Sequence, residues 1–279
     1  MTPREAVRRA AALLSEAGVP SPEADAAVLL AHALGTERSQ LPLVDEVSDE
    51  AARRYDALVA RRASREPLQH LTGEAWFRHV RLEVGPGVFT PRPETELLAG
   101  WAIEQVAESS GLVVVDLCTG SGAIAKALAD EAFGASIHAV ELDETAHGYA
   151  ARNLVDTEVD LRLGDAFTAF DDLLGQVDVV VCNPPYVPLD AWESVAPEAR
   201  DHDPHLALFS GQDGLDAIRR LAVRGAELLR PGGVLGVEHA DAQGEAVPGV
   251  LAAAGRWTDV RDHLDLAGRA RFTTARLAR

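Results

Sequence analysis

The amino-acid sequence predicts an α/β fold in which a small helical domain precedes a doubly wound, mostly parallel sheet of seven strands. After residue 112, apolar runs of strand length alternate with amphipathic helical segments, as in a parallel sheet with helices on both faces. Before residue 65, apolar residues recur at three- and four-residue spacing, as on buried helix faces. We therefore expect a helical domain at 1–72, a β-hairpin linker at 73–84 and an α/β domain at 85–279.

Three helices account for the first domain. Ser21 and Pro22 read as an N-cap followed by proline at the first helical position, and Ser48 opens the third helix. The helices are expected at residues 6–18, 22–35 and 48–64.

In the linker, apolar residues recur at every second position. Val80, Leu82 and Val84 then share one face, which predicts a hairpin or short strands. In the segment that follows, two prolines bracket Arg92 before a helix begins.

The α/β domain reads as strands and helices in alternation. The strands are expected at 112–118, 136–142, 158–164, 176–182, 232–239, 258–265 and 270–278, and the intervening helices at 123–133, 144–154 and 214–229. Continuous apolar strands of this kind are typical of a sheet that is covered on both faces.

Charge narrows the choice of partner. The chain has 279 residues and a formal net charge of −18. Residues 1–85 carry only −2, from 11 Arg and 13 acidic residues, so residues 86–279 carry −16. An acidic surface repels phosphate backbones, which argues against nucleic acid as the sole substrate and favours basic partners.

Composition also predicts the cellular compartment of the protein and whether it binds a metal. The N-terminus is charged throughout, and no apolar run approaches the length of a membrane span, so we expect a soluble, cytoplasmic protein with no membrane partner. Cys118 and Cys182 are too few for a disulfide framework or a metal set, so no metal is expected.

A glycine loop follows the first strand of the α/β domain. In "VVVDLCTGSGAIA", Gly120, Gly122 and Ala125 fit the pattern G-x-G-x-x-G/A, in which glycines let a ligand approach the backbone at a helix N-terminus. Glu141 lies about 20 positions further on, at the end of the second strand, where a carboxylate takes ribose hydroxyls. A nicotinamide cofactor and S-adenosylmethionine both satisfy this pattern.

Two carboxylates favour S-adenosylmethionine. Asp116 precedes the loop and can face the cationic methionine end, whereas it would repel a pyrophosphate; a structural hydrogen bond to the loop is the alternative interpretation. Asp165 ends the third strand and can accept a hydrogen bond from the adenine amine of the cofactor, to which Ala166 can supply a backbone N–H. A helix cap is the alternative interpretation of Asp165.

The fourth strand ends in "NPPY", Asn183 to Tyr186, beside the glycine loop in the usual strand order. The Asn183 side-chain oxygen and the Pro184 carbonyl can accept both hydrogens of a planar NH₂ group, and prolines hold that carbonyl rigidly. Tyr186 can pack on the planar group. Two acceptors orient the nitrogen lone pair toward a methyl donor and stabilise developing positive charge, so no strong base is needed.

These motifs together resemble the bacterial peptide chain release factor N5-glutamine methyltransferase family. "DLCTGSGAIA", "NPPY" and "TPRPETE" carry the resemblance, with "EPLQHLTGEAWF", "RDHDPHLALFSGQDGLD" and a late Glu238, His239 and Gln243. It covers the chain from about residue 65 to the end. "NPPY" alone is shared with adenine and guanine methyltransferases of DNA and RNA, so "PRPETE" is the specific part.

The resemblance implies a Rossmann-like methyltransferase domain, S-adenosylmethionine as cofactor and the Gly-Gly-Gln glutamine of release factors as substrate. Release factors are then the partners, through a substrate-binding helical domain, with no direct nucleic acid; we expect a monomer. The residues expected at the cofactor are Asp116, Cys118, Thr119, Gly120, Ser121, Gly122, Glu141, Asp165, Ala166 and Asn183, and those expected to hold the acceptor glutamine are Asn183, Pro184, Pro185 and Tyr186.

Two positions depart from the common form of the family. Ala166 stands where a large aromatic residue can lie beside adenine, and Thr90 replaces an aliphatic residue. Arg92 and Glu94 are expected to shape the wall of the acceptor pocket, or else to form an interdomain salt bridge.

His239 invites a role as a base, although a structural histidine is the favoured interpretation. Cys118 and Cys182 end strands that should be neighbours, so their side chains should lie near each other, without a catalytic role.

A protein glutamine methyltransferase is the leading hypothesis. A nucleic-acid amine methyltransferase, the second, conflicts with the charge of −18 and the lack of a basic stripe. The third hypothesis, a nicotinamide dehydrogenase, does not explain "NPPY". The fourth, a non-catalytic nucleotide-binding protein, gives "NPPY" no function.

Overall fold

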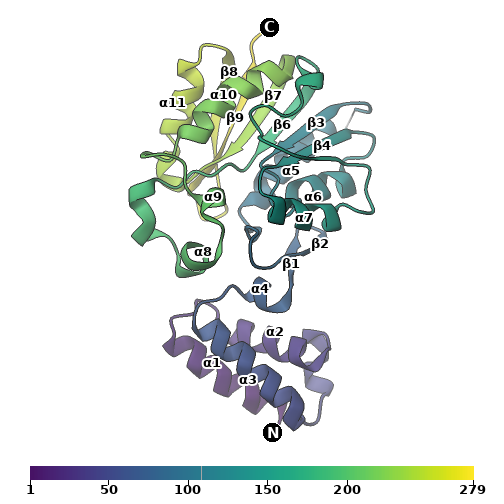
Figure 1. Cartoon of the computed structure of the whole chain (residues 1–279), viewed down its shortest axis with the longest axis vertical. Coiled ribbons are helices and arrows are strands. Elements are labelled where there is room, and N and C mark those ends of the chain that lie inside the picture. The colour runs from purple at the N-terminus through teal and green to yellow at the C-terminus, as the bar shows by residue number, and fades with distance from the viewer. Residues whose placement is uncertain (108) are drawn as a thin grey trace. The chain divides into compact units, whose positions relative to one another are not determined.

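The computed structural model describes residues 1–107 and 109–279, which form two compact units. The first unit combines Met1–Glu74 with Ala196–His202, and the second combines Ala75–Val195 with Asp203–Arg279 (Figure 1). Within the described residues, no helix combines the length and the apolar character that crossing a membrane would require.

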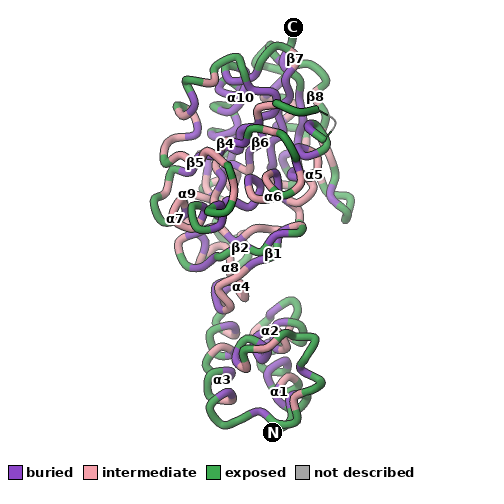
Figure 2. The backbone as a smooth tube through the Cα atoms, turned by 90° about the vertical axis from the view of Figure 1, so that its right-hand side faces the viewer, coloured by how far each residue is buried: buried purple, intermediate pink, exposed green. Residues whose placement is uncertain are grey.

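The first unit is helical. A capping box at Thr2 and Glu5 starts the first helix. Leu14, Leu29 and Tyr55 are fully buried in the core that the helices share. Figure 2 shows buried positions alternating with exposed ones along these helices. Its elements are α1 Pro3–Glu16, α2 Pro22–Leu34, the 3₁₀ helix η1 Arg38–Leu43, α3 Asp49–Ala63, α4 Leu68–Thr72 and α8 Pro197–His202.

Helix α8 enters this unit from far along the chain, and buried charges hold it there. The Arg62 guanidinium donates to Asp25 at 2.8 Å and to Glu198 at 3.0 Å, and Arg65 donates to Glu198 at 2.8 Å. The side chains of Arg62, Asp25 and Glu198 are mostly buried, so each charge depends on its partner. The sequence patterns did not predict that residues 196–202 belong to the helical unit.

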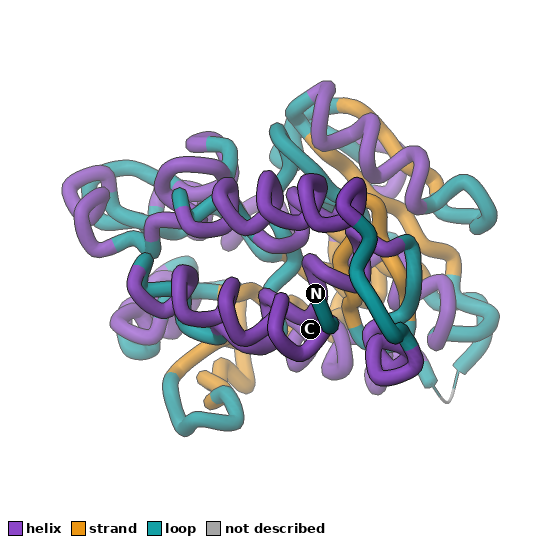
Figure 3. The backbone as a smooth tube through the Cα atoms, turned by 90° about the horizontal axis from the view of Figure 1, so that it is seen from below, coloured by secondary structure: helices purple, strands orange, loops and turns teal. Residues whose placement is uncertain are grey.

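The second unit contains a seven-stranded sheet in the order β5-β4-β3-β6-β7-β9-β8. The pairings from β5 through β7 are parallel, and β9 is antiparallel to both β7 and β8. Helices flank the strands (Figure 3), and the predicted doubly wound, mostly parallel fold is confirmed. The strands are β3 Val113–Leu117, β4 Ser136–Glu141, β5 Asp160–Leu163, β6 Val177–Cys182, β7 Leu229–Glu238, β8 Trp257–Leu264 and β9 Ala270–Leu277.

The remaining elements surround this sheet. A separate two-stranded sheet pairs β1 Glu74–Phe77 with β2 Val80–Glu83. The α-helices of this unit are α5 Thr95–Val106, α6 Ala123–Glu131, α7 Glu144–Asn153, α9 His205–Leu208, α10 Asp216–Leu228 and α11 Ala246–Ala253; the 3₁₀ helices are η2 Asp171–Leu173, η3 Leu189–Ser194 and η4 Asp241–Gln243.

Alternate residues of the central strands feed two separate cores. Val114 of β3 and Val181 of β6 join the cluster that includes α5, α6 and α7, while Val115 and Val180 join the cluster that includes α10 and α11. Successive side chains of a strand point to opposite faces, so an apolar strand without alternation needs a helix layer on each side.

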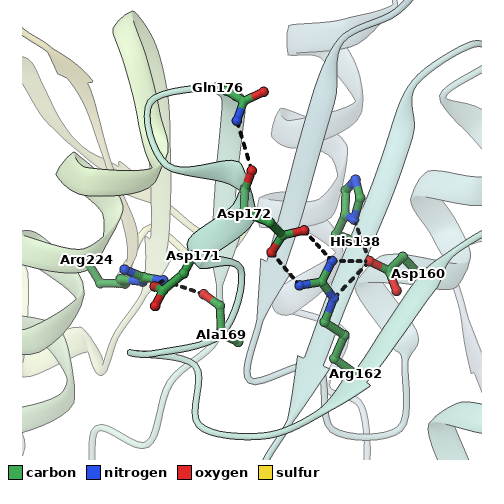
Figure 4. Close-up of polar contacts among 8 residues, drawn as sticks. All are labelled: His138, Asp160, Arg162, Ala169, Asp171, Asp172, Gln176 and Arg224. Atoms are coloured by element: carbon green, nitrogen blue, oxygen red, sulfur yellow. Dashed lines mark hydrogen bonds and ion pairs between the residues drawn. The ribbon is translucent and has the colours of Figure 1, made fainter.

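Charged residues fix the outer edge of the sheet near β5. Arg162 donates to Asp160 and to Asp172 of η2 (Figure 4). Its guanidinium also lies 4.4 Å from the centre of the Phe170 ring. The buried Arg224 of α10 bonds Asp171 in the same segment. These contacts hold the chain that leaves the carboxyl end of β5.

Candidate active site

Strands β3 and β6 are neighbours, with Leu117 opposite Cys182, so the segments after both strands emerge at the same edge of the sheet. The glycine loop follows β3 and "NPPY" follows β6. This adjacency of two parallel strands is the usual position of ligand sites in doubly wound sheets.

The glycine loop is shaped for a ligand that lies against its backbone. Gly120 and Gly122 both have positive φ, of 59° and 83°. A Cβ on Gly122 would crowd Ala150 and Leu154 at 3.3–3.4 Å, whereas one on Gly120 would meet no described atom within 4 Å. Gly122 is also the N-cap of α6 and supplies no side-chain cap, which leaves backbone N–H groups for an anionic ligand group.

Asp116 lies beneath this loop and is fully buried. Its Oδ2 accepts from the Thr119 hydroxyl at 2.5 Å, but its Oδ1 has no hydrogen-bond partner within the described part of the chain. Burial raises the pKa of Asp116 to about 7, against hydrogen bonds from Thr119 and the Ala125 backbone that lower it. A buried carboxylate oxygen without a partner fits the cationic methionine end of S-adenosylmethionine.

Glu141 ends β4 and closes the loop against that strand. Its Oε2 accepts from the Gly120 N–H at 2.8 Å, and its Oε1 accepts from the N–H groups of Leu142 and Asp143. Burial raises its pKa, and these backbone donors oppose that shift. The carboxylate is therefore held at the rim of the loop, where ribose hydroxyls can join the Gly120 donor.

Asp165 and Ala166 follow β5. The Oδ1 of Asp165 accepts from the Phe167 N–H at 2.9 Å, and its Oδ2 pairs with Arg220 at 3.1 Å. Residues 166–170 form a turn and not a helix, so the alternative of a helix cap is wrong. Ala166 is buried, and Arg220 covers the neighbouring Phe167 ring at 3.8 Å. Phe167, the aromatic residue one position later, packs against the core that includes α10 and α11.

"NPPY" is anchored on several sides. The half-buried Asn183 donates from Nδ2 to the Thr95 hydroxyl at 3.3 Å. Tyr186 donates its hydroxyl to Glu238 at 3.3 Å, and its backbone carbonyl accepts from Gln243 at 3.0 Å. Burial, and then the Glu238 carboxylate, raise the pKa of the Tyr186 hydroxyl, which keeps it protonated. Pro184 is buried and Pro185 is half-buried.

Gly214 and Thr95 contact the "NPPY" segment, and the sequence patterns assigned neither of them to the site. A Cβ on Gly214 would lie 2.2 Å from the Tyr186 carbonyl oxygen. Any residue other than glycine would therefore clash with that carbonyl. Gly214 lies in "GQDGLD" and Thr95 in "PRPETE", two segments that the resemblance had singled out without assigning either residue a role.

Arg92 and Glu94 form ion pairs within the second unit. Arg92 donates to the buried Asp203 at 2.6 Å, and burial raises the pKa of Asp203 to about 6 against the opposing effect of Arg92. Glu94 lies 3.8 Å from Arg269 on a more exposed surface. The alternative of an interdomain salt bridge is therefore wrong for both residues, because their partners belong to the same unit.

His239 is structural. It is fully buried, its Nδ1 bonds the Ala240 carbonyl, and its Nε2 lies 2.9 Å from the Thr273 hydroxyl and 3.0 Å from Asp262. Burial lowers its pKa. With both ring nitrogens engaged, it has no nitrogen left for a substrate proton.

Cys118 directly follows β3 and Cys182 ends the neighbouring strand β6, as expected, and burial followed by the effect of Cys118 raises the pKa of Cys182. Groups of three or more metal-ligating side chains are absent from the residues that the structure covers.

The fold and the two adjoining loops define the methyltransferase class. Residues 82–197 match the family model of the methyltransferase small domain. The crystal structure of a methyltransferase from Pyrococcus furiosus, 19% identical, superimposes with a TM-score of 0.50 over 70% of this chain and 87% of that chain.

The whole chain narrows this class further. Residues 5–73 match the family model of the PrmC N-terminal domain. The chain is 57% identical to the release factor glutamine methyltransferase of Streptomyces coelicolor, over 98% of this chain and 97% of that protein. It is 47% identical to the one of Mycolicibacterium smegmatis, over 99% and 98%. The chain belongs to the release factor glutamine methyltransferase family.

Proposed function

We propose that this chain transfers a methyl group from S-adenosylmethionine to the side-chain amide nitrogen of the glutamine in the Gly-Gly-Gln motif of release factors. The observation that carries this proposal is the adjacency of the glycine loop after β3 and "NPPY" after β6. A cofactor at the first segment and a planar NH₂ group at the second would lie next to each other.

The residues of "NPPY" supply orientation rather than a base. The Asn183 Oδ1 and the Pro184 carbonyl accept the two hydrogens of the substrate amide, while the Tyr186 ring packs against its plane. S-adenosylmethionine supplies an electrophilic methyl group. With both hydrogens held, the nitrogen lone pair points out of the amide plane toward that methyl, and positive charge developing on nitrogen is stabilised. Transfer leaves S-adenosylhomocysteine and an N-methylated amide cation, which is acidic enough for water to take its proton.

The cofactor is proposed to lie along the glycine loop. Asp116 faces its cationic methionine end, Glu141 takes its ribose hydroxyls, and Asp165 with Ala166 borders its adenine. The backbone of residues 118–122 is proposed to form the floor of this site, because Gly120 leaves that surface open. Arg92 and Glu94 are proposed to border the acceptor pocket, since they directly precede Thr95, which accepts from the Asn183 side chain.

Cofactor affinity should depend on pH through Asp116. Its pKa of about 7 means that it is largely protonated at pH 6, and a bound cation favours the ionised form. Binding then releases a proton below pH 7, so affinity should rise by up to about tenfold per unit from pH 5.5 and level off above pH 7. Calorimetry across this range measures the effect. Asp116→Asn should bind more weakly and lose the slope; the same slope in that variant would assign it to another group.

Charge supports a basic protein as partner. The charge of −16 on residues 86–279 would steer a basic release factor surface toward the site, while the nearly neutral helical unit adds a second contact. We further propose that the enzyme acts in the cytoplasm, as a monomer and without direct contact to nucleic acid.

A labelling experiment tests the substrate. Radiolabelled S-adenosylmethionine is incubated with the enzyme and either a purified release factor, its Gly-Gly-Gln variant with glutamine replaced by alanine, or duplex DNA. We expect one methyl group on that glutamine, and none on the variant or the DNA. Mass spectrometry that places the methyl on an adenine, or finds no labelled glutamine, would overturn the assignment in favour of a nucleic-acid amine methyltransferase or another acceptor.

A further inference from the structure

Tyr186 has three polar groups, and each of them has a hydrogen-bond partner within the second unit. Its N–H donates to the Leu208 carbonyl at 3.1 Å, its hydroxyl donates to Glu238 Oε1 at 3.3 Å, and its carbonyl accepts from Gln243 Nε2 at 3.0 Å. Tyr186 is half-buried, and it packs against the core that includes α10 and α11. Because the hydroxyl is already engaged, Tyr186 can offer an acceptor amide the face of its ring.

Gln243, the partner of the Tyr186 carbonyl, is itself held in one orientation by backbone groups. Its Oε1 accepts from the Ala240 N–H at 3.0 Å, and its Nε2 donates to the Tyr186 carbonyl and, at 3.4 Å, to the Asp213 carbonyl. A backbone N–H only donates and a carbonyl only accepts, so the carboxamide cannot be turned by 180° without losing all three bonds. Gln243 is also buried, so water competes poorly for these bonds.

Gly214 encloses the same carbonyl. A Cβ on Gly214 would lie 2.2 Å from the Tyr186 oxygen and 2.8 Å from Gln243 Nε2. The Tyr186 carbonyl therefore lies directly against the Gly214 backbone while it accepts from Gln243. Three segments meet at this point, the end of "NPPY", the loop before α10 and the 3₁₀ helix η4 that follows β7.

We infer that Gln243 is a positioning residue for methyl transfer, which fixes the Tyr186 backbone and thereby the plane of the ring against which the acceptor amide packs. Glu238 holds the other end of the same side chain through the hydroxyl. A ring held at both ends is preorganised, so it need not be ordered when the substrate binds. This role rests on the proposed function, and it assigns a task to the late glutamine that the resemblance had singled out.

Kinetics of a Gln243 variant test this role. Gln243→Met keeps the length of the side chain but removes its three hydrogen bonds. We expect kcat with a release factor to fall about tenfold, with unchanged affinity for S-adenosylmethionine, because the ring loses its fixed plane. In a Tyr186→Ala background the same change should cost nothing more, since Gln243 acts through the ring. An equal loss in both backgrounds, or wild-type turnover in Gln243→Met, would refute the role.

Gln176 provides a matched control. Its Nε2 also donates to a backbone carbonyl, that of Asp172 at 2.9 Å, but on the exposed surface. Gln176→Met removes this bond by the same exchange of side chains, and it should turn over as fast as the wild type. A tenfold loss in this variant as well would mean that the exchange itself, and not the contact with Tyr186, lowers kcat.

A second measurement needs no turnover. The chain contains three tyrosines, Tyr55, Tyr149 and Tyr186, so incorporation of fluorotyrosine places one fluorine reporter on each for NMR. Gln243→Met should shift and broaden the Tyr186 signal, because the ring becomes mobile, while the Tyr55 and Tyr149 signals stay unchanged. Gln176→Met should change none of the three.

The other outcomes of the fluorine experiment are equally decisive. An unchanged Tyr186 signal in Gln243→Met would refute the positioning of the ring. Changes in the Tyr55 and Tyr149 signals as well would show that Gln243 maintains the whole fold, and would refute a local role. If the predicted NMR change occurs but the wild-type enzyme labels no glutamine, the proposed function is overturned while the contact with Tyr186 stands.

Discussion

Replacing Asn183 by alanine is expected to lower kcat about 10²–10³-fold, the loss seen when one preorganised partner of a developing charge is removed. Its oxygen matters most in the transition state, when the amide nitrogen begins to carry positive charge. The affinity for S-adenosylmethionine should fall much less, because the Asn183 side chain lies at the acceptor end of the proposed site. Single-turnover methylation of a release factor measures the first quantity, and calorimetry measures the second.

Two controls make the Asn183 result specific. Thermal unfolding of Asn183→Ala should match that of the wild type, since the side chain is half-buried and its one described hydrogen bond is to Thr95. Thr95→Val should show a smaller loss in kcat. Near-wild-type turnover in Asn183→Ala would remove Asn183 from the mechanism.

Replacing Glu141 by alanine is expected to weaken S-adenosylmethionine binding about 10- to 100-fold. Hydrogen bonds to a charged group contribute about 1.5–3 kcal/mol each, and the ribose offers two hydroxyls to this carboxylate. Part of the loss would come from the loop, because Glu141 also accepts from the Gly120 N–H. Calorimetry with wild type and variant measures the change.

An analogue separates the two contributions. S-adenosylhomocysteine without its ribose hydroxyls should lose much less affinity on Glu141→Ala than S-adenosylhomocysteine itself, because only the loop contribution remains. An equal loss for both ligands would assign Glu141 to the loop alone. Tight binding of NAD with no binding of S-adenosylmethionine would reject the cofactor.

Local sequence patterns predicted the sheet well because strand and helix periods depend on neighbours in the chain. The continuous apolar run of β6 requires helices on both faces, and Val180 and Val181 indeed face different cores. Helix α11, Ala246–Ala253, escaped prediction because Pro248 and Gly249 lie within it and read as loop residues.

The candidate site was predictable where its residues follow strands directly. Asp116, Glu141 and Asn183 are each found by counting from an apolar run, and parallel strands bring their carboxyl ends to one edge. Glu238 also ends a strand, but its partners do not follow from that position. The ion pair of Arg92 was not predictable in this way. The sequence shows the charge of Arg92, but its partner Asp203 lies 111 residues away along the chain.

The sequence by itself determined which elements form, which faces they bury and which two loops carry the chemistry, because these follow from side-chain periodicity and from the backbone preferences of glycine and proline. Only the tertiary structure decided which polar side chains meet. Thr95 contacts Asn183 across 88 residues, and Glu198 returns to Arg62 across 136. Such pairs depend on the path of the whole chain, since a buried charge or amide takes its partner from whatever residue the packing places within hydrogen-bond distance.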